Sequence, residues 1–330
     1  MSMQFQLQNA PADIISAVRF NPSERYSSFL LASSWDSTLS LYDTSVENGR
    51  LLTRVDGVAP LLDCCWDELG RSAYIGGLEN RVRMVDLESG RCSTLGAHDD
   101  AIKCVSFHRP SGLVVSGSWD RTVQLHDYRS SSRVCASSLP HKVFSMDITG
   151  NLLVVGMAGR AVHIYDIRNM DEPFQRRESS LKYMTRAIKC IPTGDGYASS
   201  SIEGRIAVDF FDASPDVQAK KYAFKCHRAV EDDMDTVYPV NALAFHPLHG
   251  TFVSGGADSL VCFWDYKARK RLRQYPRYPG PIQALEIDSK GSSLAISYGG
   301  DVEVGLEGNA QVNNGIIIRS LAPGEGKSKA

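Results

Sequence analysis

The sequence predicts an all-β fold, a seven-bladed β-propeller whose ring is closed by an amino-terminal strand. One observation is a recurring hairpin, in which a short strand, a tight turn with a small polar residue and a second strand end in Asp. Another is the spacing of these aspartates, roughly 40 to 50 residues, which is typical of four-stranded propeller blades. The six aspartates are Asp43, Asp86, Asp127, Asp166, Asp212 and Asp265.

The clearest copy of the hairpin spans residues 115–127. Apolar and polar residues alternate along its second strand, as in a half-buried strand. Asp120 stands where a short side chain can accept a hydrogen bond from the turn backbone, and Asp36 and Asp258 hold the same place in other copies. We interpret His98 as a hydrogen-bond partner of Asp120 inside the blade rather than as a catalytic base.

The seventh blade has three strands near the carboxyl terminus, at 282–287, 294–297 and 315–318. Residues 4–7 can supply the missing outer strand, which would close the ring and satisfy an open sheet edge. The sequence therefore predicts one domain over residues 1–321 and a disordered tail over 322–330. Two segments fall outside the blade rhythm: an acidic stretch at 231–235, interpreted as a solvated loop, and a Gly- and Asn-rich insertion at 301–314 of unassigned role.

Composition excludes several classes of protein. A net charge of -2 over 330 residues does not fit a bulk nucleic-acid binder. The amino terminus lacks the regions of a signal peptide, and no apolar run approaches the roughly 20 residues that span a bilayer. The eight cysteines form no Cys-x-x-Cys pair and are interpreted as reduced thiols of an intracellular protein. No Gly-x-Ser-x-Gly or His-Glu-x-x-His motif is present, so we expect no catalytic residue, metal site or cofactor.

The hairpin turns are unusual in their side chains. Turns between the second and third strands of a propeller's blades emerge on one face, and here they carry Trp35, Trp119, Arg81, Arg121, Arg160 and Arg205. A large aromatic residue at an exposed turn indicates a covering partner, and Trp and Arg dominate binding hot spots. Arginine also matches carboxylate and phosphate geometry. This face should attract an acidic or phosphorylated peptide with apolar anchors.

Two connections between blades add positive charge on the same face. One contains Lys182, Tyr183 and Arg186, and the other runs from Lys220 through Lys225 to Arg228. We expect them to place a local cationic patch beside Arg205, which stands out because the whole chain is slightly acidic.

The repeats resemble those of the WD-repeat family. Among the six repeat-ending aspartates only Asp265 follows a Trp, which gives the WD dipeptide Trp264-Asp265, and Gly96-Ala97-His98 resembles the family's Gly-His position with one residue inserted. More specifically, the chain closely resembles the WD-repeat adaptor of the mitotic spindle assembly checkpoint (Bub family) over nearly its whole length. The residues that carry this likeness are Glu-Ser-Ser-Leu-Lys-Tyr at 178–183, Ser-Ser-Ile-Glu-Gly-Arg-Ile-Ala-Val at 200–208, Tyr-Ala-Phe-Lys-Cys-His-Arg at 222–228 and Tyr-Pro-Val-Asn-Ala at 238–242.

The resemblance implies two peptide-binding activities on the face that carries the turns. One binds a short motif of the checkpoint kinase and its kinase-like relative, with Trp35 and Trp119 as apolar anchors and Arg186 and Lys225 opposite acidic side chains; Tyr183 and Glu203 complete this candidate set. The other recognises a phosphothreonine on a kinetochore scaffold repeat through Arg205 and Lys225. The resemblance also implies a nuclear protein that is recruited to kinetochores in mitosis. It assigns no role to Arg81, Arg121 and Arg160, which rest on the turn pattern alone.

Other functions remain open at this point. The related nuclear-pore mRNA-export adaptor (Rae family) shares Ser-Ile-Glu-Gly-Arg and Phe-Lys-Cys-His-Arg, so it is the alternative adaptor. A propeller hydrolase is an alternative from another class, because function has to be argued from a site rather than from a fold. We expect no direct nucleic-acid or membrane partner, and a chain that is monomeric on its own because closure satisfies most strand edges.

Overall fold

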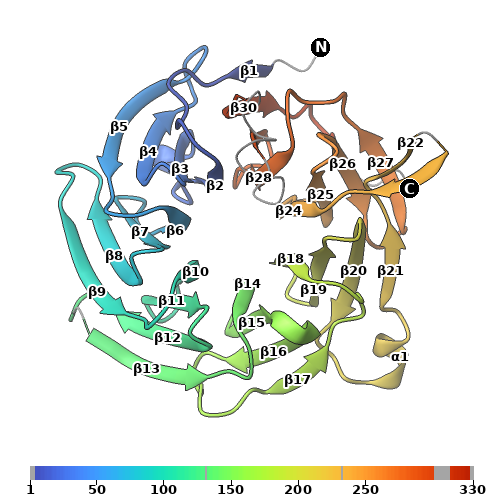
Figure 1. Ribbon diagram of the computed structural model, residues 1–330, viewed down its shortest axis with the longest axis horizontal. Coiled ribbons are helices and arrows are strands. Elements are labelled where there is room, and N and C mark those ends of the chain that lie inside the picture. Colours follow the sequence, from blue (N-terminus) through green and yellow to red (C-terminus); the bar gives the residue numbers. More distant parts are fainter. Residues whose placement is uncertain (1–3, 131, 232, 301–312, 328–330) are drawn as a thin grey trace.

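Each blade is an antiparallel sheet of four strands, ordered from the innermost at a central channel to the outermost at the rim (Figure 1). The computed structural model describes residues 4–130, 132–231, 233–300 and 313–327. Blades 1 to 3 consist of β2 (Ile15–Phe20), β3 (Phe29–Ser34), β4 (Thr38–Asp43) and β5 (Arg50–Asp56); β6 (Leu61–Trp66), β7 (Ser72–Gly77), β8 (Arg81–Asp86) and β9 (Cys92–Ala97); and β10 (Ile102–His108), β11 (Leu113–Ser118), β12 (Thr122–Asp127) and β13 (Ser132–Ser138).

The second half of the ring repeats this order. Blades 4 to 6 consist of β14 (Val143–Thr149), β15 (Leu152–Met157), β16 (Ala161–Asp166) and β17 (Gln175–Glu178); β18 (Thr185–Cys190), β19 (Gly196–Ser201), β20 (Arg205–Phe210) and β21 (Tyr222–Lys225); and β24 (Val240–Phe245), β25 (Thr251–Gly256), β26 (Val261–Asp265) and β27 (Lys270–Gln274). Within the described residues, the helical elements are the single turns η1 (Glu24–Tyr26), η2 (Ala158–Arg160) and α1 (Pro215–Gln218).

Blade 7 confirms the predicted closure. Its inner strands are β28 (Ile282–Ile287), β29 (Ser293–Tyr298) and β30 (Gly315–Ser320), and β1 (Gln4–Gln6) adds the outer strand. Gln4 lies opposite Arg319 and Gln6 opposite Ile317 in an antiparallel register. The ladder continues where the Leu7 amide donates to the Ile316 carbonyl at 2.8 Å, and the Leu7 side chain is buried. The first residues of the chain therefore complete the sheet formed by its last strands.

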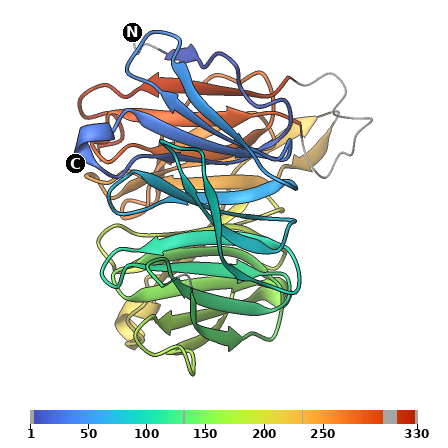
Figure 2. The ribbon, with the colours of Figure 1, turned by 90° about the vertical axis from the view of Figure 1, so that its left-hand side faces the viewer.

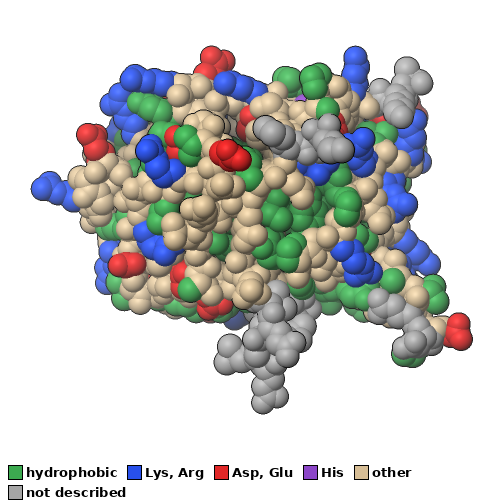
Figure 3. Space-filling view, turned by 90° about the horizontal axis from the view of Figure 1, so that it is seen from above, with side chains coloured by type: hydrophobic (Ala, Val, Ile, Leu, Met, Phe, Trp, Pro, Cys, Tyr) green, Lys and Arg blue, Asp and Glu red, His purple; other side chains and the backbone are tan. Residues whose placement is uncertain are grey.

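Figure 3 shows the disk edge-on, from above the view of Figure 1. On this side of the rim, positive and negative side chains are mixed and neither sign forms a large patch. Lysine and arginine side chains are spread over this side, acidic side chains lie among them, and apolar side chains gather near the centre. This distribution matches the small net charge of the chain.

The core lies between blades, where the faces of neighbouring sheets pack together. One cluster joins blades 3 and 4 through Val115, Leu125 and Leu153. A Cβ added to Gly117 would lie 2.9 Å from the Val143 side chain, and one on Gly255 would lie 2.3 Å from the Ile282 side chain. A glycine at this strand position therefore lets the next blade approach closely, which explains part of the sequence repeat.

Charged side chains from the innermost strands meet inside the channel. Arg19 Nη2 lies 2.8 Å from Asp63 Oδ1, Arg19 Nη1 lies 3.9 Å from Glu286, and Lys189 Nζ lies 3.6 Å from Asp147. Burial raises the pKa of Glu286. These pairs join the inner strands of neighbouring blades, and loss of one partner would leave an uncompensated charge in a confined space.

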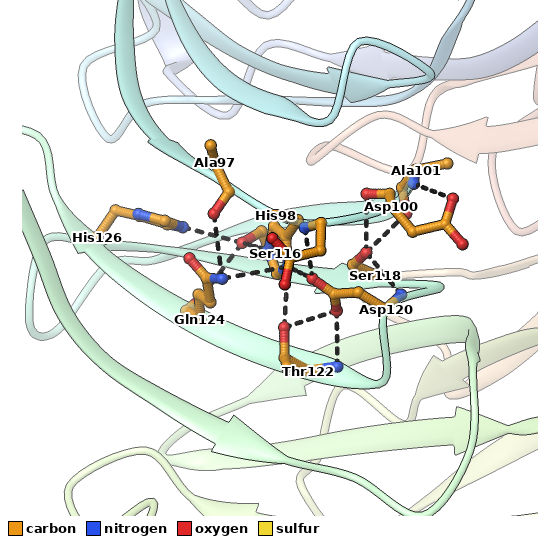
Figure 4. Close-up of polar contacts among 11 residues, drawn as sticks. Ala97, His98, Asp100, Ala101, Ser116, Ser118, Asp120, Thr122, Gln124 and His126 are labelled. Atoms are coloured by element: carbon orange, nitrogen blue, oxygen red, sulfur yellow. Dashed lines mark hydrogen bonds and ion pairs between the residues drawn. The ribbon is translucent and has the colours of Figure 1, made fainter.

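A hydrogen-bond network stabilises the hairpin of blade 3 and confirms the interpretation of His98 (Figure 4). His98 Nδ1 lies 2.9 Å from Asp120 Oδ2, and His98 Nε2 lies 2.8 Å from Ser116 Oγ. Asp120 Oδ1 accepts the Thr122 amide at 2.8 Å, which fixes the turn. His126 Nε2 reaches the same Ser116 hydroxyl at 2.9 Å. In blade 6 Trp264 donates to Ser254 in the matching place, so His126 is the histidine version of that contact.

The acidic stretch at 231–235 differs from the prediction of a solvated loop. The chain forms a two-stranded hairpin there, β22 (Arg228–Glu231) with β23 (Met234–Val237), inserted between blades 5 and 6. It projects from one face of the disk, gold in Figure 2. The hairpin is solvated, with Val230 and Met234 exposed, but its backbone is paired rather than irregular.

Residues 322–327 of the carboxyl-terminal segment make specific contacts, and the disorder predicted for 322–330 stays a prediction. The buried Glu325 carboxylate accepts the Tyr275 hydroxyl at 2.8 Å and pairs with Arg273, and Thr251 donates to the Gly326 carbonyl at 2.6 Å. The composition shows only that this segment is polar, whereas the structure shows that residues of blades 6 and 7 surround the Glu325 carboxylate. The boundary at residue 321 stays a prediction, and most of the insertion at 301–314 lies outside the described residues.

The buried histidine pair predicts a pH-dependent stability. Burial, with the charges of His98 and Arg133, lowers the pKa of His126 to about 4, against about 6.5 in an unfolded chain. The unfolded chain therefore binds a proton first as pH falls, so the free energy of unfolding should be highest above pH ~6.5 and should decrease towards pH ~4. Urea unfolding at several pH values measures this, and His126→Gln should flatten the decrease. An equal decrease in both proteins would contradict it.

Candidate functional site

One hydrogen bond recurs between the hairpin turns and the connections that enter each blade. The Trp35 amide donates to Ile14 O at 2.9 Å, the Trp119 amide to Ala101 O at 2.9 Å, and the Ile202 amide to Met184 O at 3.2 Å. The turns and the connections therefore lie at the same end of the blades, as the sequence predicted. We call this end the upper face.

The channel opens on the upper face into a cavity of about 330 Å³. Trp35 from blade 1, Trp119 from blade 3 and Arg186 from blade 5 line it, so three of the predicted site residues come together although 151 positions separate the first from the last. We call this cavity the channel mouth. Its lining presents apolar and cationic side chains to a peptide that lies across the ring.

The two indoles are half-buried, not exposed at turn tips as predicted. Both residues line the channel mouth, and Lys142 Nζ lies 5.7 Å from the centre of the Trp119 ring. The indole nitrogen of Trp119 is buried and has no hydrogen-bond partner among the residues that the structure describes. A ligand that lies across the mouth could cover the remaining apolar surface of both rings.

A second group of predicted residues lies on blade 5. Arg205 begins β20 and lies directly opposite Lys225 on β21, so the two side chains are cross-strand neighbours. Arg205 Nε donates to Glu203 Oε1 at 3.0 Å, and Lys225 is exposed. Tyr183, 52% exposed, lies in the connection into this blade. We call Glu203, Arg205 and Lys225 the blade 5 group; it does not line the channel mouth.

The four turn arginines do not hold one equivalent position, which corrects the pattern read from the sequence. Arg121 and Arg160 occupy the turn residue with left-handed backbone, at φ 67° and 66°. Arg81 and Arg205 come one residue later, as the first residues of β8 and β20. Asn80 and Gly204 take the left-handed position in those blades. The four arginines therefore form two pairs, Arg121 with Arg160 and Arg81 with Arg205, one residue apart in the turn. The sequence pattern missed this shift because the turns lack a common Asp.

The structure adds residues to the channel mouth that the sequence did not single out. Lys103, Phe144, Asn241 and Gln283 line it from the innermost strands and their approaches. Each blade's first strand borders the channel, so alternate residues at its beginning point to the mouth. Once the blades are assigned from the sequence, residues at the beginning of each first strand are therefore candidates for the channel mouth.

The residues of the channel mouth include aromatic, cationic and thiol-bearing side chains. No group of three or more His, Cys, Asp or Glu suited to a metal ion occurs within the described residues. All eight cysteines are free thiols, and burial raises the pKa of Cys64 to about 12. Among the described segments, no helix has the length and apolar character needed to cross a membrane. Indoles beside guanidinium and ammonium groups can bind apolar and anionic side chains.

Comparisons with known proteins agree with this architecture. The family model described as WD domain, G-beta repeat, matches residues 4–43, 90–127 and 224–265. The chain is 45% identical to Mitotic checkpoint protein BUB3.1 of Arabidopsis thaliana, over 98% of this chain and 94% of that protein. It is 33% identical to the Poly(A)+ RNA export protein of Schizosaccharomyces pombe, over 98% and 92%.

A solved structure supports the fold alone. The crystal structure of the RRP9 WD40 repeats is similar with a TM-score of 0.81 at 17% identity, over 97% of each chain. Structural similarity at that sequence identity supports the propeller fold but assigns no functional residue.

Proposed function

Because the chain belongs to the family of WD-repeat mitotic checkpoint proteins, we propose that it is a non-enzymatic adaptor that brings two checkpoint partners together on its upper face. The partners are a short motif of the checkpoint kinase and its kinase-like relative, and a phosphothreonine repeat of a kinetochore scaffold. The protein would act in the nucleus and at kinetochores in mitosis.

The convergence of Trp35, Trp119 and Arg186 at one channel mouth carries the proposal for the kinase motif. Such a mouth can anchor apolar side chains of a peptide while its cations meet acidic ones. Tyr183, Glu203 and Lys225 lie in or beside the connections on the same face and would extend the contact towards blade 5.

The blade 5 group supports the phosphothreonine site. A phosphothreonine carries a charge of about −1.5 to −2 at neutral pH and three acceptor oxygens. Arg205 supplies a planar fork and Lys225 a mobile ammonium from the adjacent strand, a combination suited to that charge. Arg81 shares the strand position of Arg205 but lacks a cation on the neighbouring strand, since it lies opposite Ala97.

The mRNA-export adaptor is the alternative of the same class. Identity to the export relative is 33%, against 45% to the checkpoint relative over a similar share of the chain, which favours the checkpoint function. Peptide titration of the purified protein distinguishes the two functions. Binding to nucleoporin peptides without binding to a kinase-motif peptide would favour the mRNA-export function.

Arg205→Ala should remove the preference for a phosphorylated scaffold peptide. The arginine is partly exposed at the start of a strand, so its truncation should leave the fold intact while one of two phosphate-binding cations is lost. Calorimetric titration with phosphorylated and unphosphorylated peptide, beside thermal unfolding, measures both effects. Equal binding of the two peptide forms by the wild type would refute the phosphate site.

Trp35→Ala and Trp119→Ala should weaken the kinase-motif peptide by about 2 kcal/mol or more, as for interface anchors. Because each indole is half-buried, the free energy of unfolding should fall by less than the roughly 3–5 kcal/mol of a core aromatic. Peptide titration and urea unfolding separate the two costs. A large loss of stability with unchanged peptide affinity would assign both indoles to the structure alone.

A further inference from the structure

The inserted hairpin β22–β23 is joined to blade 5 through Arg228, the first residue of β22. The side chain of Arg228 is 15% exposed. Its Nη2 donates to the Glu203 backbone carbonyl at 2.9 Å and lies 3.5 Å from Glu203 Oε1, while its Nη1 lies 3.4 Å from Asp235 Oδ2. One guanidinium thus links the turn of blade 5 to both strands of the hairpin.

Glu203 connects this guanidinium to that of Arg205. The same oxygen, Oε1, accepts from Arg205 Nε at 3.0 Å and lies within reach of Arg228. Within the described residues, Glu203 is the ion-pair partner of Arg205. Because that bond uses Nε, the Nη edge of the Arg205 fork remains for an incoming anion.

Close packing fixes the turn that carries this pair of charges. A Cβ on Gly204 would lie 2.6 Å from the Cys226 carbonyl oxygen and 3.0 Å from that of His227, so the turn lies directly on the root of the hairpin. The Cys226 amide also donates to Gly204 O at 2.9 Å. The turn backbone is therefore held by the root of the hairpin, and Arg228 contacts both the carbonyl and the carboxylate of Glu203.

We propose that Arg228 is a positioning residue for phosphothreonine recognition. It does not touch the phosphate but holds Glu203, which in turn orients the fork of Arg205 towards the ligand. Orientation before binding reduces the side-chain entropy lost when the phosphate is bound. The inference rests on the proposed function of the blade 5 group and adds the hairpin as its support.

A double-mutant cycle tests whether Arg228 acts through Glu203. Arg228→Met should weaken a phosphothreonine peptide about tenfold in the wild-type background and less than about twofold in a Glu203→Ala background. The unphosphorylated peptide should change little in either. Equal losses in both backgrounds, or no loss in the first, would overturn the inference.

Two further variants separate positioning from a structural role. Arg160→Met is the matched control, because Arg160 also pairs with a glutamate, Glu178, and donates to the backbone of the adjacent connection, one blade away; it should leave phosphopeptide affinity unchanged. Arg228→Lys keeps the charge, and thermal unfolding should be close to wild type. We expect it to lose at least about fivefold in affinity, since one ammonium cannot replace the planar fork; full affinity would contradict the proposal.

A wild-type protein that binds both peptide forms equally would refute the proposed function itself. A wild type that prefers the phosphorylated form, together with an Arg228→Met variant that keeps the same preference, would refute the role of Arg228 alone. The two failures are thus distinguishable.

Discussion

Closure of the ring is the constraint on which the rest of the molecule depends. The short strand β1 completes the sheet of β28, β29 and β30, so the last blade has its fourth strand only when both ends of the chain meet. The channel mouth follows from that closure, because Trp35, Trp119 and Arg186 come from blades 1, 3 and 5 and face one another only around a complete ring. A binding surface of this kind needs no moving part. Its geometry is set by packing between blades.

Within that frame, carboxylates hold the cations in place. Asp63 and Asp147 pair with Arg19 and Lys189 inside the channel, and Glu203 stands between Arg205 and Arg228 on the upper face. An arginine held at Nε is preorganised for an anion at its other edge, so a slightly acidic protein can still present a local cationic site.

The repeat allowed the sequence to predict the blades, the closing strand and the contact of His98 with Asp120, because each depends on local pattern and spacing. The half-burial of Trp35 and Trp119 was not predictable, since it depends on which inner-strand residues surround the channel. The hairpin at 228–237 was not predicted, because its acidic residues indicated a solvated loop and its short sequence lacks the alternation that marks a strand, although the backbone of the two strands is paired. Arg228 was named only as the end of a basic stretch, and its role follows from contacts with a turn 25 positions earlier.

Amide hydrogen exchange of the protein with and without a kinase-motif peptide tests the central claim most directly. The account predicts protection in the turns at Trp35 and Trp119 and in the connection that carries Tyr183 and Arg186, with no change in the turn at 86–90 on the opposite face. Protection confined to the rim or to the opposite face, with the channel mouth unchanged, would contradict it.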